Sequence, residues 1–231
     1  MKKSVIVLLL GVAVSAGLFQ SCNDKSNDKI TIEETKDLAV VDVDPDAATL
    51  NMQNMQAAFK GETTASAKYE AFSKKADEEG YFEIALLFKA ASVAENIHAN
   101  NHKIIIERAG QETPEITPEF TVKTTKENLE NAIEGESYEF FTMYPEFIKN
   151  ANKAGNYMAQ ISLTYAYKVE EKHRDFYIKA LEALENNNVK SLPSVYFLCP
   201  TCGNTYDTVA PKRCEISMTN AENFIRLDSL N

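Results

Sequence analysis

Two of the three histidines in this 231-residue chain follow a glutamate at the same spacing. They lie in the motifs Glu95-Asn96-Ile97-His98 and Glu170-Glu171-Lys172-His173. Residues three apart share one face of an α-helix, so each motif directs a carboxylate and an imidazole toward the same point. A single motif of this kind is typical of a solvated helix face, whereas two of them predict a metal site with oxygen and nitrogen ligands.

The two motifs occupy equivalent points of an internal repeat. Five residues recur 75 positions later: Phe72, Ala76, Gly80, Glu95 and His98. The pair Gly61-Glu62 recurs 74 positions later, as Gly135-Glu136, so the second copy carries one extra residue between Glu136 and Phe147. Helices commonly absorb such an insertion as a π-bulge, and Pro145 in this stretch is consistent with a disturbed hydrogen-bond ladder. We therefore expect two helical hairpins, with a π-bulge in the third helix.

Apolar spacing and punctuation support long helices between residues 47 and 186. Apolar residues such as Ile84, Leu87 and Phe88 recur at intervals of three and four, as on a helix that faces a core. Gly80, Gly110 and Gly155 each follow a helical pattern and are expected to end it, and the run 124–127 has the spacing of a capping box. The segment 111–123 then forms a crossover. The pattern predicts a mainly α fold, a four-helix bundle.

The other two helices each contribute a glutamate that follows a glycine. A glutamate from each of two helices, with Glu-x-x-His from each of the other two, is the pattern of a di-iron carboxylate bundle. Four buried carboxylates would repel one another and take up protons, so two divalent ions are their natural partners. The expected iron ligands are Glu62, Glu95, His98, Glu136, Glu170 and His173. His102 lacks such a partner pattern, and we interpret it as a surface residue or a support behind the ligands.

Composition excludes several classes of function. Lys and Arg number 24 against 34 Asp and Glu, which gives a net charge of −10. Such a chain is repelled by the nucleic-acid backbone, so no nucleic-acid partner is expected. Four cysteines are too few for a disulfide scaffold in a chain of this length.

The first 22 residues are predicted to be a signal peptide. Lys2 and Lys3 precede the apolar run 5–19, which is too short for an ordinary membrane span. The run ends in Phe19-Gln20-Ser21-Cys22, which resembles a bacterial lipobox with Cys22 as the lipidated residue. Ordinary cleavage nearer Ala16 is the alternative. Residues 23–46 are polar and acidic, typical of a tether, so we expect an exported lipoprotein of the cell envelope with a lipid anchor in the membrane.

The C-terminal residues 196–231, which follow a linker at 187–195, form a second candidate metal site. Cys199-Pro200-Thr201-Cys202-Gly203 is a metal-knuckle sequence, and Ser217 stands after Cys214 where a fourth cysteine would complete a four-sulfur site. Three interpretations stay open. Iron binds three thiolates and the Ser217 oxygen, zinc binds three thiolates with Ser217 or water, or the site is empty with Cys199 and Cys202 free or disulfide-bonded.

Several stretches together give the chain a clear resemblance to rubrerythrin. Residues 47–186 carry Ala58-Phe59-Lys60-Gly61-Glu62, Ala76-Asp77-Glu78-Glu79-Gly80-Tyr81, Ala94-Glu95-Asn96-Ile97-His98-Ala99, Gly135-Glu136-Ser137-Tyr138-Glu139 and Met143-Tyr144-Pro145 in the family's order and spacing. Residues 196–231 resemble the family's rubredoxin domain through the knuckle, Tyr206, Ala210-Pro211 and Phe224-Ile225-Arg226. The resemblance implies a ferritin-like di-iron bundle followed by a small rubredoxin-like domain.

Further roles follow from this resemblance alone. It implies that Glu139, within the inserted stretch, is an additional metal-binding carboxylate, and that one iron moves between Glu139 and His98 as the redox state changes. Tyr69 and Tyr144 would donate hydrogen bonds to the ligand carboxylates and, with Glu139, manage protons; ordinary core tyrosines are the alternative. The implied assembly is a head-to-tail homodimer in which one subunit's knuckle approaches the other's di-iron site.

The activity implied by the resemblance is the reduction of hydrogen peroxide, with electrons from an external donor. Two other functions stay open at this point. One is a ferroxidase or iron-binding protein that uses dioxygen as oxidant. The other is a non-enzymatic binding protein of the envelope that keeps the bundle as a scaffold.

Overall fold

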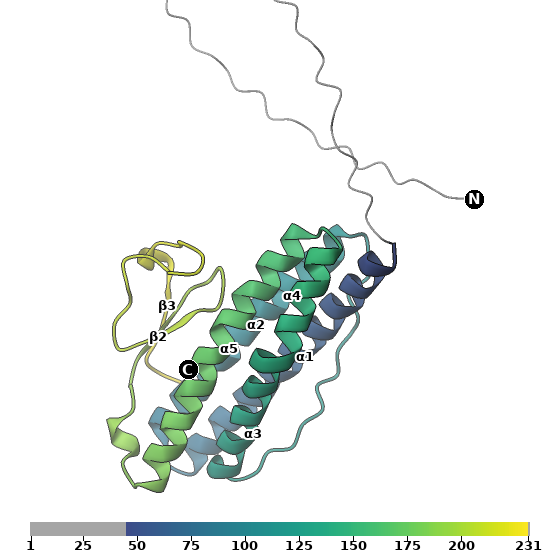
Figure 1. Ribbon diagram of the computed structural model, residues 1–231. Coiled ribbons are helices and arrows are strands. Elements are labelled where there is room, and N and C mark those ends of the chain that lie inside the picture. Colours follow the sequence, from purple (N-terminus) through teal and green to yellow (C-terminus); the bar gives the residue numbers. More distant parts are fainter. Residues whose placement is uncertain (1–44, 231) are drawn as a thin grey trace, which may run out of the picture. The chain divides into compact units, whose positions relative to one another are not determined.

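The computed structural model describes residues 45–230, which contain a bundle of long helices and a small strand region (Figure 1). The helical elements are α1 (Pro45–Glu78), α2 (Phe82–Arg108), α3 (Thr125–Tyr138), the π-helical turn η1 (Glu139–Met143), α4 (Tyr144–Lys153) and α5 (Tyr157–Glu185). Because α3, η1 and α4 follow one another without a gap, they act as the third long helix of a four-helix bundle. The predicted mainly α fold with a four-helix bundle is confirmed.

The predicted N-terminal features lie almost entirely outside the described residues. The signal peptide 1–22, Cys22 and most of the tether 23–46 lie within residues 1–44, which are outside the described residues. Pro45 and Asp46, assigned to the tether, instead begin α1. Proline suits this position because the first residue of a helix needs no N–H for an intrahelical bond. Within residues 45–230, no helix combines the length and apolar character that a membrane span requires.

The turns form where the sequence places them. Gly80 and Gly155 adopt φ angles of +86° and +63°, which glycine tolerates without a steric penalty. The Thr124 hydroxyl accepts a hydrogen bond from the Glu127 N–H, and the Glu127 carboxylate accepts one from the Thr124 N–H, so the capping box is present. The crossover between α2 and α3 has no regular secondary structure and runs along the outside of the bundle (Figure 1).

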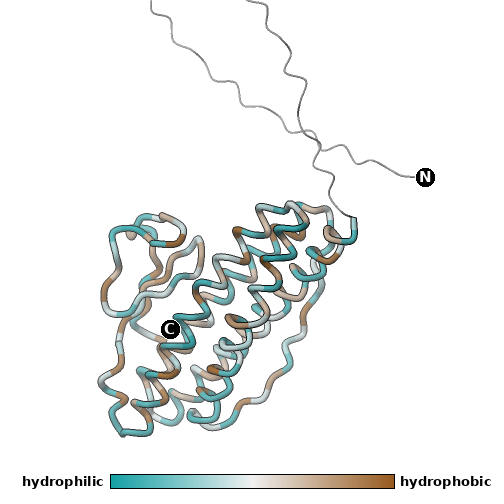
Figure 2. The backbone as a smooth tube through the Cα atoms, in the orientation of Figure 1, coloured by the Kyte–Doolittle hydropathy of each residue, from teal (hydrophilic) through white to brown (hydrophobic). Residues whose placement is uncertain are grey.

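The bundle interior consists of two apolar clusters. Figure 2 shows hydrophobic and hydrophilic residues alternating along the long helices, as expected for helices with one buried face. One cluster contains Phe72, Phe88 and Tyr177, and the other contains Met55 and Leu163. Along α1, α2 and α5 the buried glutamates and histidines of the predicted metal site fall between these clusters in sequence. The predicted metal ligands therefore lie between two layers of apolar side chains.

The C-terminal region is a small antiparallel sheet that packs on the bundle. Its strands are β1 (Tyr196–Leu198), β2 (Thr205–Asp207) and β3 (Ile225–Leu227), in the order β2-β1-β3, with short 3-10 helices η2 (Val189–Ser191) and η3 (Ala221–Asn223). Tyr196 and Leu198 join the apolar cluster of α2 and α5, and the Tyr196 ring lies 6.0 Å from that of Phe176. The sheet therefore shares its core with the helices.

Candidate metal centre

The six predicted ligands come together in two groups of buried side chains. Within each group the ligand atoms lie within 4.8 Å of one another. The groups are Glu62, Glu95, His98 and Glu170, and Glu95, Glu136, Glu170 and His173. Glu95 and Glu170 belong to both groups, so each can supply one oxygen to each of two neighbouring ions. This arrangement is that of a dinuclear site with two bridging carboxylates.

Both histidines direct the Nδ1 atom toward these carboxylates. His98 Nδ1 lies 2.9 Å from a Glu95 oxygen and 3.2 Å from a Glu170 oxygen. His173 Nδ1 lies 3.0 Å from the other Glu95 oxygen and 3.3 Å from the other Glu170 oxygen. The Nε2 atoms point the other way, 3.0 Å from the Cys202 carbonyl oxygen and 3.1 Å from the Thr205 hydroxyl, respectively. A hydrogen bond on the second ring nitrogen is the usual support for a metal-ligating histidine.

The electrostatics of the site call for positive charge. Burial and the neighbouring Glu95 charge raise the pKa of Glu62 to about 8. Burial alone would lower the pKa of His173, but the charges of Glu95 and Glu170 raise it to about 10. Within residues 45–230, one oxygen of Glu62 and both oxygens of Glu170 are buried without a hydrogen-bond partner. Since buried charges in proteins are paired or bind metals, these orphaned oxygens fit two divalent ions.

Tyr69 and Tyr144 lie where the resemblance predicts them. The Tyr69 hydroxyl donates to Glu136, and the Tyr144 hydroxyl donates to Glu62. Burial, followed by the charge of the adjacent glutamate, raises the pKa of both phenols well above the usual value. Each tyrosine therefore keeps its proton at a ligand carboxylate.

Glu139 lies at the first residue of the π-helical turn η1. The predicted insertion is thus a π-bulge. Glu139 is partly buried and belongs to neither four-residue group. Its Oε1 would be 3.9 Å from a Cβ atom added to Gly61, next to Glu62. Burial and then the Glu62 charge raise the pKa of Glu139. The carboxyl group of Glu139 therefore lies beside the Glu62 half of the site.

His102 is fully buried, so the surface interpretation is wrong and its place behind the ligands is correct. Its Nδ1 lies 2.8 Å from the Ser162 hydroxyl, and its Nε2 lies 3.2 Å from the Tyr144 hydroxyl. The signal that could have shown this is the repeat. His102 is equivalent to Tyr177, 75 residues later, and both positions face the bundle interior.

Comparison with known proteins agrees with this geometry. The family model described as rubrerythrin matches residues 53–181. The chain belongs to the rubrerythrin family. Nigerythrin from Nitratidesulfovibrio vulgaris is 32% identical over 196 residues, 84% of this chain and 95% of nigerythrin. Rubrerythrin-1 from Clostridium acetobutylicum is 32% identical over 172 residues, 72% of this chain and 88% of that protein.

Solved structures extend the match to three dimensions. The fully reduced, all-ferrous state of nigerythrin aligns with a TM-score of 0.68 and 33% identity, over 76% of this chain and 86% of nigerythrin. Bacterioferritin BfrA from Mycobacterium tuberculosis aligns with a TM-score of 0.54 and 23% identity, over 62% of this chain and 88% of that chain, which shows the shared fold alone. As a rubrerythrin-family member, this chain is a di-iron oxidative-stress protein, and the two groups of glutamates and histidines are its metal site.

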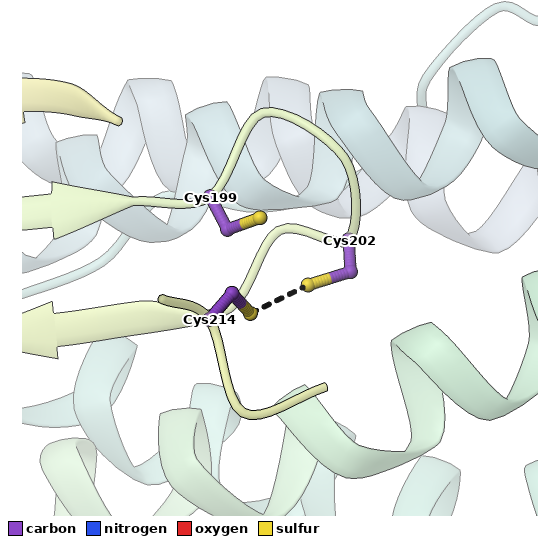
Figure 3. A group of neighbouring side chains, drawn as sticks. All are labelled: Cys199, Cys202 and Cys214. Atoms are coloured by element: carbon purple, nitrogen blue, oxygen red, sulfur yellow. Dashed lines mark hydrogen bonds between the residues drawn. The ribbon is translucent and has the colours of Figure 1, made fainter. Parts of the chain in front are cut away.

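The rubredoxin-like region of this rubrerythrin-family chain contains a second cluster of ligand-type residues. The thiols of Cys199, Cys202 and Cys214 converge from two loops, and none of these three forms a disulfide (Figure 3). The Cys202 and Cys214 sulfurs are 3.4 Å apart, and the Cys199 sulfur lies 3.1 Å from the Ser217 hydroxyl. Hydrogen bonds from Cys202 and Ser217 lower the pKa of Cys199, whereas the hydrogen bond to Cys199 raises the pKa of Cys202, so Cys199 is the thiol of this pair that favours the thiolate that metals bind.

The knuckle lies directly on the di-iron site of its own chain. Gly203 approaches His98 so closely that an added Cβ atom would be 2.4 Å from Nε2. Two polar contacts hold the region in place: Lys172 Nζ lies 2.8 Å from a Glu215 oxygen, and the Asn101 amide donates to the Thr201 carbonyl at 2.9 Å. Within the single chain, the knuckle thus contacts the site; the approach of a partner's knuckle, which the resemblance implies, stays a prediction.

Proposed function

We propose that the protein is a peroxidase that reduces hydrogen peroxide to water at its di-iron site. The observation that carries this proposal is the pair of buried ligand groups that share Glu95 and Glu170, with Glu139 beside them at a π-helical turn. Shared carboxylates would hold two iron ions next to each other, so both electrons of a two-electron reduction would be available at one point. Relatives in the rubrerythrin family support this choice.

The chain's own residues would bind the ions and hold the protons that this reaction consumes. When bound, two ferrous ions would supply two electrons, and one hydrogen peroxide would take up these and two protons to give two water molecules. Tyr144 and Tyr69 hold their hydroxyl protons at Glu62 and Glu136, so proton donors lie beside the ligands on both sides. Glu139, whose pKa is raised, is a third place to hold a proton.

Glu139 and His98 are the residues that we propose to exchange as ligands when the redox state changes. The positions of both residues support this assignment. His98 belongs to the same ligand group as Glu62, and Glu139 lies on the Glu62 side of the site. An anionic carboxylate suits the more highly charged ferric ion, whereas a neutral imidazole suits the ferrous ion.

An anaerobic titration tests the peroxidase proposal. The protein, loaded with iron and reduced, is titrated with hydrogen peroxide, and about one molecule should oxidise both ferrous ions of a chain. The matched control is the double variant Glu95→Ala/His98→Ala, which should keep its helical circular dichroism but consume no peroxide. Oxidation by the double variant, or a chain that binds no iron, would refute the proposal and favour a scaffold protein.

We propose that the knuckle binds one iron or zinc ion through Cys199, Cys202, Cys214 and Ser217. The 3.1 Å contact between the Ser217 oxygen and the Cys199 sulfur puts the hydroxyl among the thiols. An oxygen ligand is harder than a thiolate, so it should lower the reduction potential of bound iron. With iron bound, Ser217→Cys should shift the visible charge-transfer absorption toward that of a tetrathiolate site. An unchanged spectrum in Ser217→Cys would remove the serine from the ligand set.

We propose that the protein is exported and anchored in the cell envelope by a lipid on Cys22. The support is the sequence of residues 1–22, with Lys2, Lys3 and the apolar run that follows. Incorporation of labelled palmitate into the wild-type chain, and its loss in Cys22→Ser, is the expected result. Equal labelling of both proteins would disprove the anchor.

We propose a homodimer that receives its electrons from an external donor. Exposed apolar side chains on η1 and α5 support an interface between two copies, since Phe141 is 64% exposed and Tyr157 is 72% exposed. Light scattering on the purified protein should give twice the mass of one chain. A monomer at micromolar concentration would contradict this assembly.

A further inference from the structure

The internal repeat allows the two halves of the di-iron site to be compared residue by residue. Tyr69 and Tyr144 are equivalent positions, 75 residues apart, and each donates a hydrogen bond to a ligand glutamate. The residues behind them differ. His102 lies behind Tyr144, and its equivalent behind Tyr69 is Tyr177. One half of the site therefore has a polar support where the other half has an aromatic one.

The hydrogen bonds behind Tyr144 have a defined direction. With metal bound, Glu62 is a carboxylate that can only accept, so the single phenol proton of Tyr144 is donated to Glu62 and the Tyr144 oxygen accepts from His102 Nε2–H. His102 Nδ1 then accepts from the Ser162 hydroxyl, 2.8 Å away. A ring that donates through Nε2 and accepts through Nδ1 is neutral, and His102 is fully buried. The result is a one-way chain from Ser162 through His102 and Tyr144 to Glu62.

The corresponding positions in the other half contain no such chain. The position equivalent to Ser162 is Leu87, which cannot form a hydrogen bond with its side chain. Tyr177 packs its ring 5.5 Å from the Tyr69 ring, and its buried hydroxyl has no hydrogen-bond partner among the described residues. Tyr69 is thus held by aromatic packing, without the donor that Tyr144 receives.

We propose that His102 is a positioning residue that, supported by Ser162, fixes the Tyr144 hydroxyl as the hydrogen-bond donor to Glu62 and makes the two halves of the di-iron site unequal. The N–H of His102 occupies the Tyr144 oxygen and leaves its proton directed at Glu62. Hydrogen bonds in a chain polarise one another, so Tyr144 is also the stronger donor of the two tyrosines. The effect falls on the half that contains His98 and borders Glu139.

The hydrogen-bond chain can be tested without any catalytic assay. With only three histidines, nitrogen NMR of the zinc-loaded protein labelled at histidine resolves each ring. His102 should be neutral with its proton on Nε2, and Tyr144→Phe should shift that N–H signal, while the matched variant Tyr177→Phe should leave it in place. A His102 proton on Nδ1, or a His102 N–H signal that is unchanged in Tyr144→Phe, would overturn the proposal.

The consequence for chemistry rests on the proposed peroxidase function and is measured separately. His102→Leu should slow the oxidation of the reduced site by peroxide by about tenfold, as is typical when a support behind a metal ligand is removed. His102→Gln restores an N–H donor and should recover most of the rate, and Tyr177→Phe should stay within about twofold of the wild type. A rate in His102→Leu equal to that of the wild type would overturn the positioning role.

The NMR experiment and the rate measurement test different claims, so their failures can be told apart. If peroxide does not oxidise the wild-type protein, the proposed function is wrong, but the NMR result on His102 still decides whether the hydrogen-bond chain exists. If His102→Leu does not fold, Ser162→Ala replaces it, because loss of the Ser162 donor should move the His102 Nδ1 resonance and lower the rate. An unchanged Nδ1 resonance in Ser162→Ala would overturn the chain.

Discussion

Glu95 and Glu170 determine whether this site holds two ions or one. Each is buried, and each has one oxygen near His98 and the other near His173. Glu62 and Glu136, by contrast, each belong to a single ligand group. The shared carboxylates are therefore expected to affect both ions, and the unshared ones a single ion.

Iron content should follow this division. Glu95→Ala removes a ligand from both ions, so we expect it to retain almost no iron, whereas Glu136→Ala should retain about one ion per chain. Glu171→Ala, an exposed neighbour of Glu170, is the matched control and should keep about two. Iron analysis of protein loaded under anaerobic conditions measures all three. Equal iron loss in Glu95→Ala and Glu136→Ala would contradict the assignment of shared ligands.

Metal binding should depend on pH with a definite sign. The raised pKa values of Glu62, about 8, and His173, about 10, mean that both side chains carry protons at neutral pH before metal binds. Metal must displace these protons, so its apparent affinity should rise as the pH increases from about 6 to 8. Zinc titrations against a competing chelator measure this, and an affinity that is flat or falls with pH would be the contrary result.

At the scale of elements, the π-helical turn η1 and the knuckle loop set the geometry around the ligands. The turn lengthens the third helix by one residue and places Glu139 beside the site. The loop at Gly203 brings the Cys202 carbonyl within 3.0 Å of His98. Gly203 has a φ of +75°, and its missing side chain makes this approach possible.

Gly203→Ala should therefore displace the knuckle from the bundle. The added methyl group would collide with His98 and make a tight contact with the Ala94 carbonyl, and the backbone angle adds strain, so we expect a loss of about 2 kcal/mol or more in the free energy of unfolding. Gly110→Ala is the matched control, because its φ is +71° but nothing lies within 4 Å of the added atom. Thermal unfolding of both variants separates the effect of backbone strain, present in both, from that of the steric collision, present only in Gly203→Ala. Equal destabilisation would mean that the close contact is unimportant.

Local patterns in the sequence are enough to predict most of this fold and of the metal site. The Glu-x-x-His spacing, the capping box at Thr124 and the one-residue change of offset each describe a single helix, and each is present. His102 could not be placed in the same way, because its partner Ser162 is 60 residues away on another helix. The contact between Gly203 and His98 joins two regions that are far apart in the sequence, so no periodic pattern of residues predicts it.

For the whole molecule, the main consequence is that the knuckle and the di-iron site form one unit. The Nε2 atoms of both ligand histidines are hydrogen-bonded by residues of the knuckle region. Three thiols and Ser217 therefore lie close to the di-iron ligands within a single chain. The net charge of −10 indicates that an external electron donor with a basic docking surface would be favoured.

Hydrogen peroxide, rather than dioxygen, is the proposed oxidant of the reduced site. Stopped-flow absorption spectroscopy of the fully reduced protein, mixed in parallel with equal concentrations of the two oxidants, tests it directly. We predict that peroxide oxidises the site at least about tenfold faster than dioxygen, because Tyr144, Tyr69 and Glu139 place protons where peroxide reduction consumes them. Faster oxidation by dioxygen would contradict the peroxidase and identify the protein as a ferroxidase.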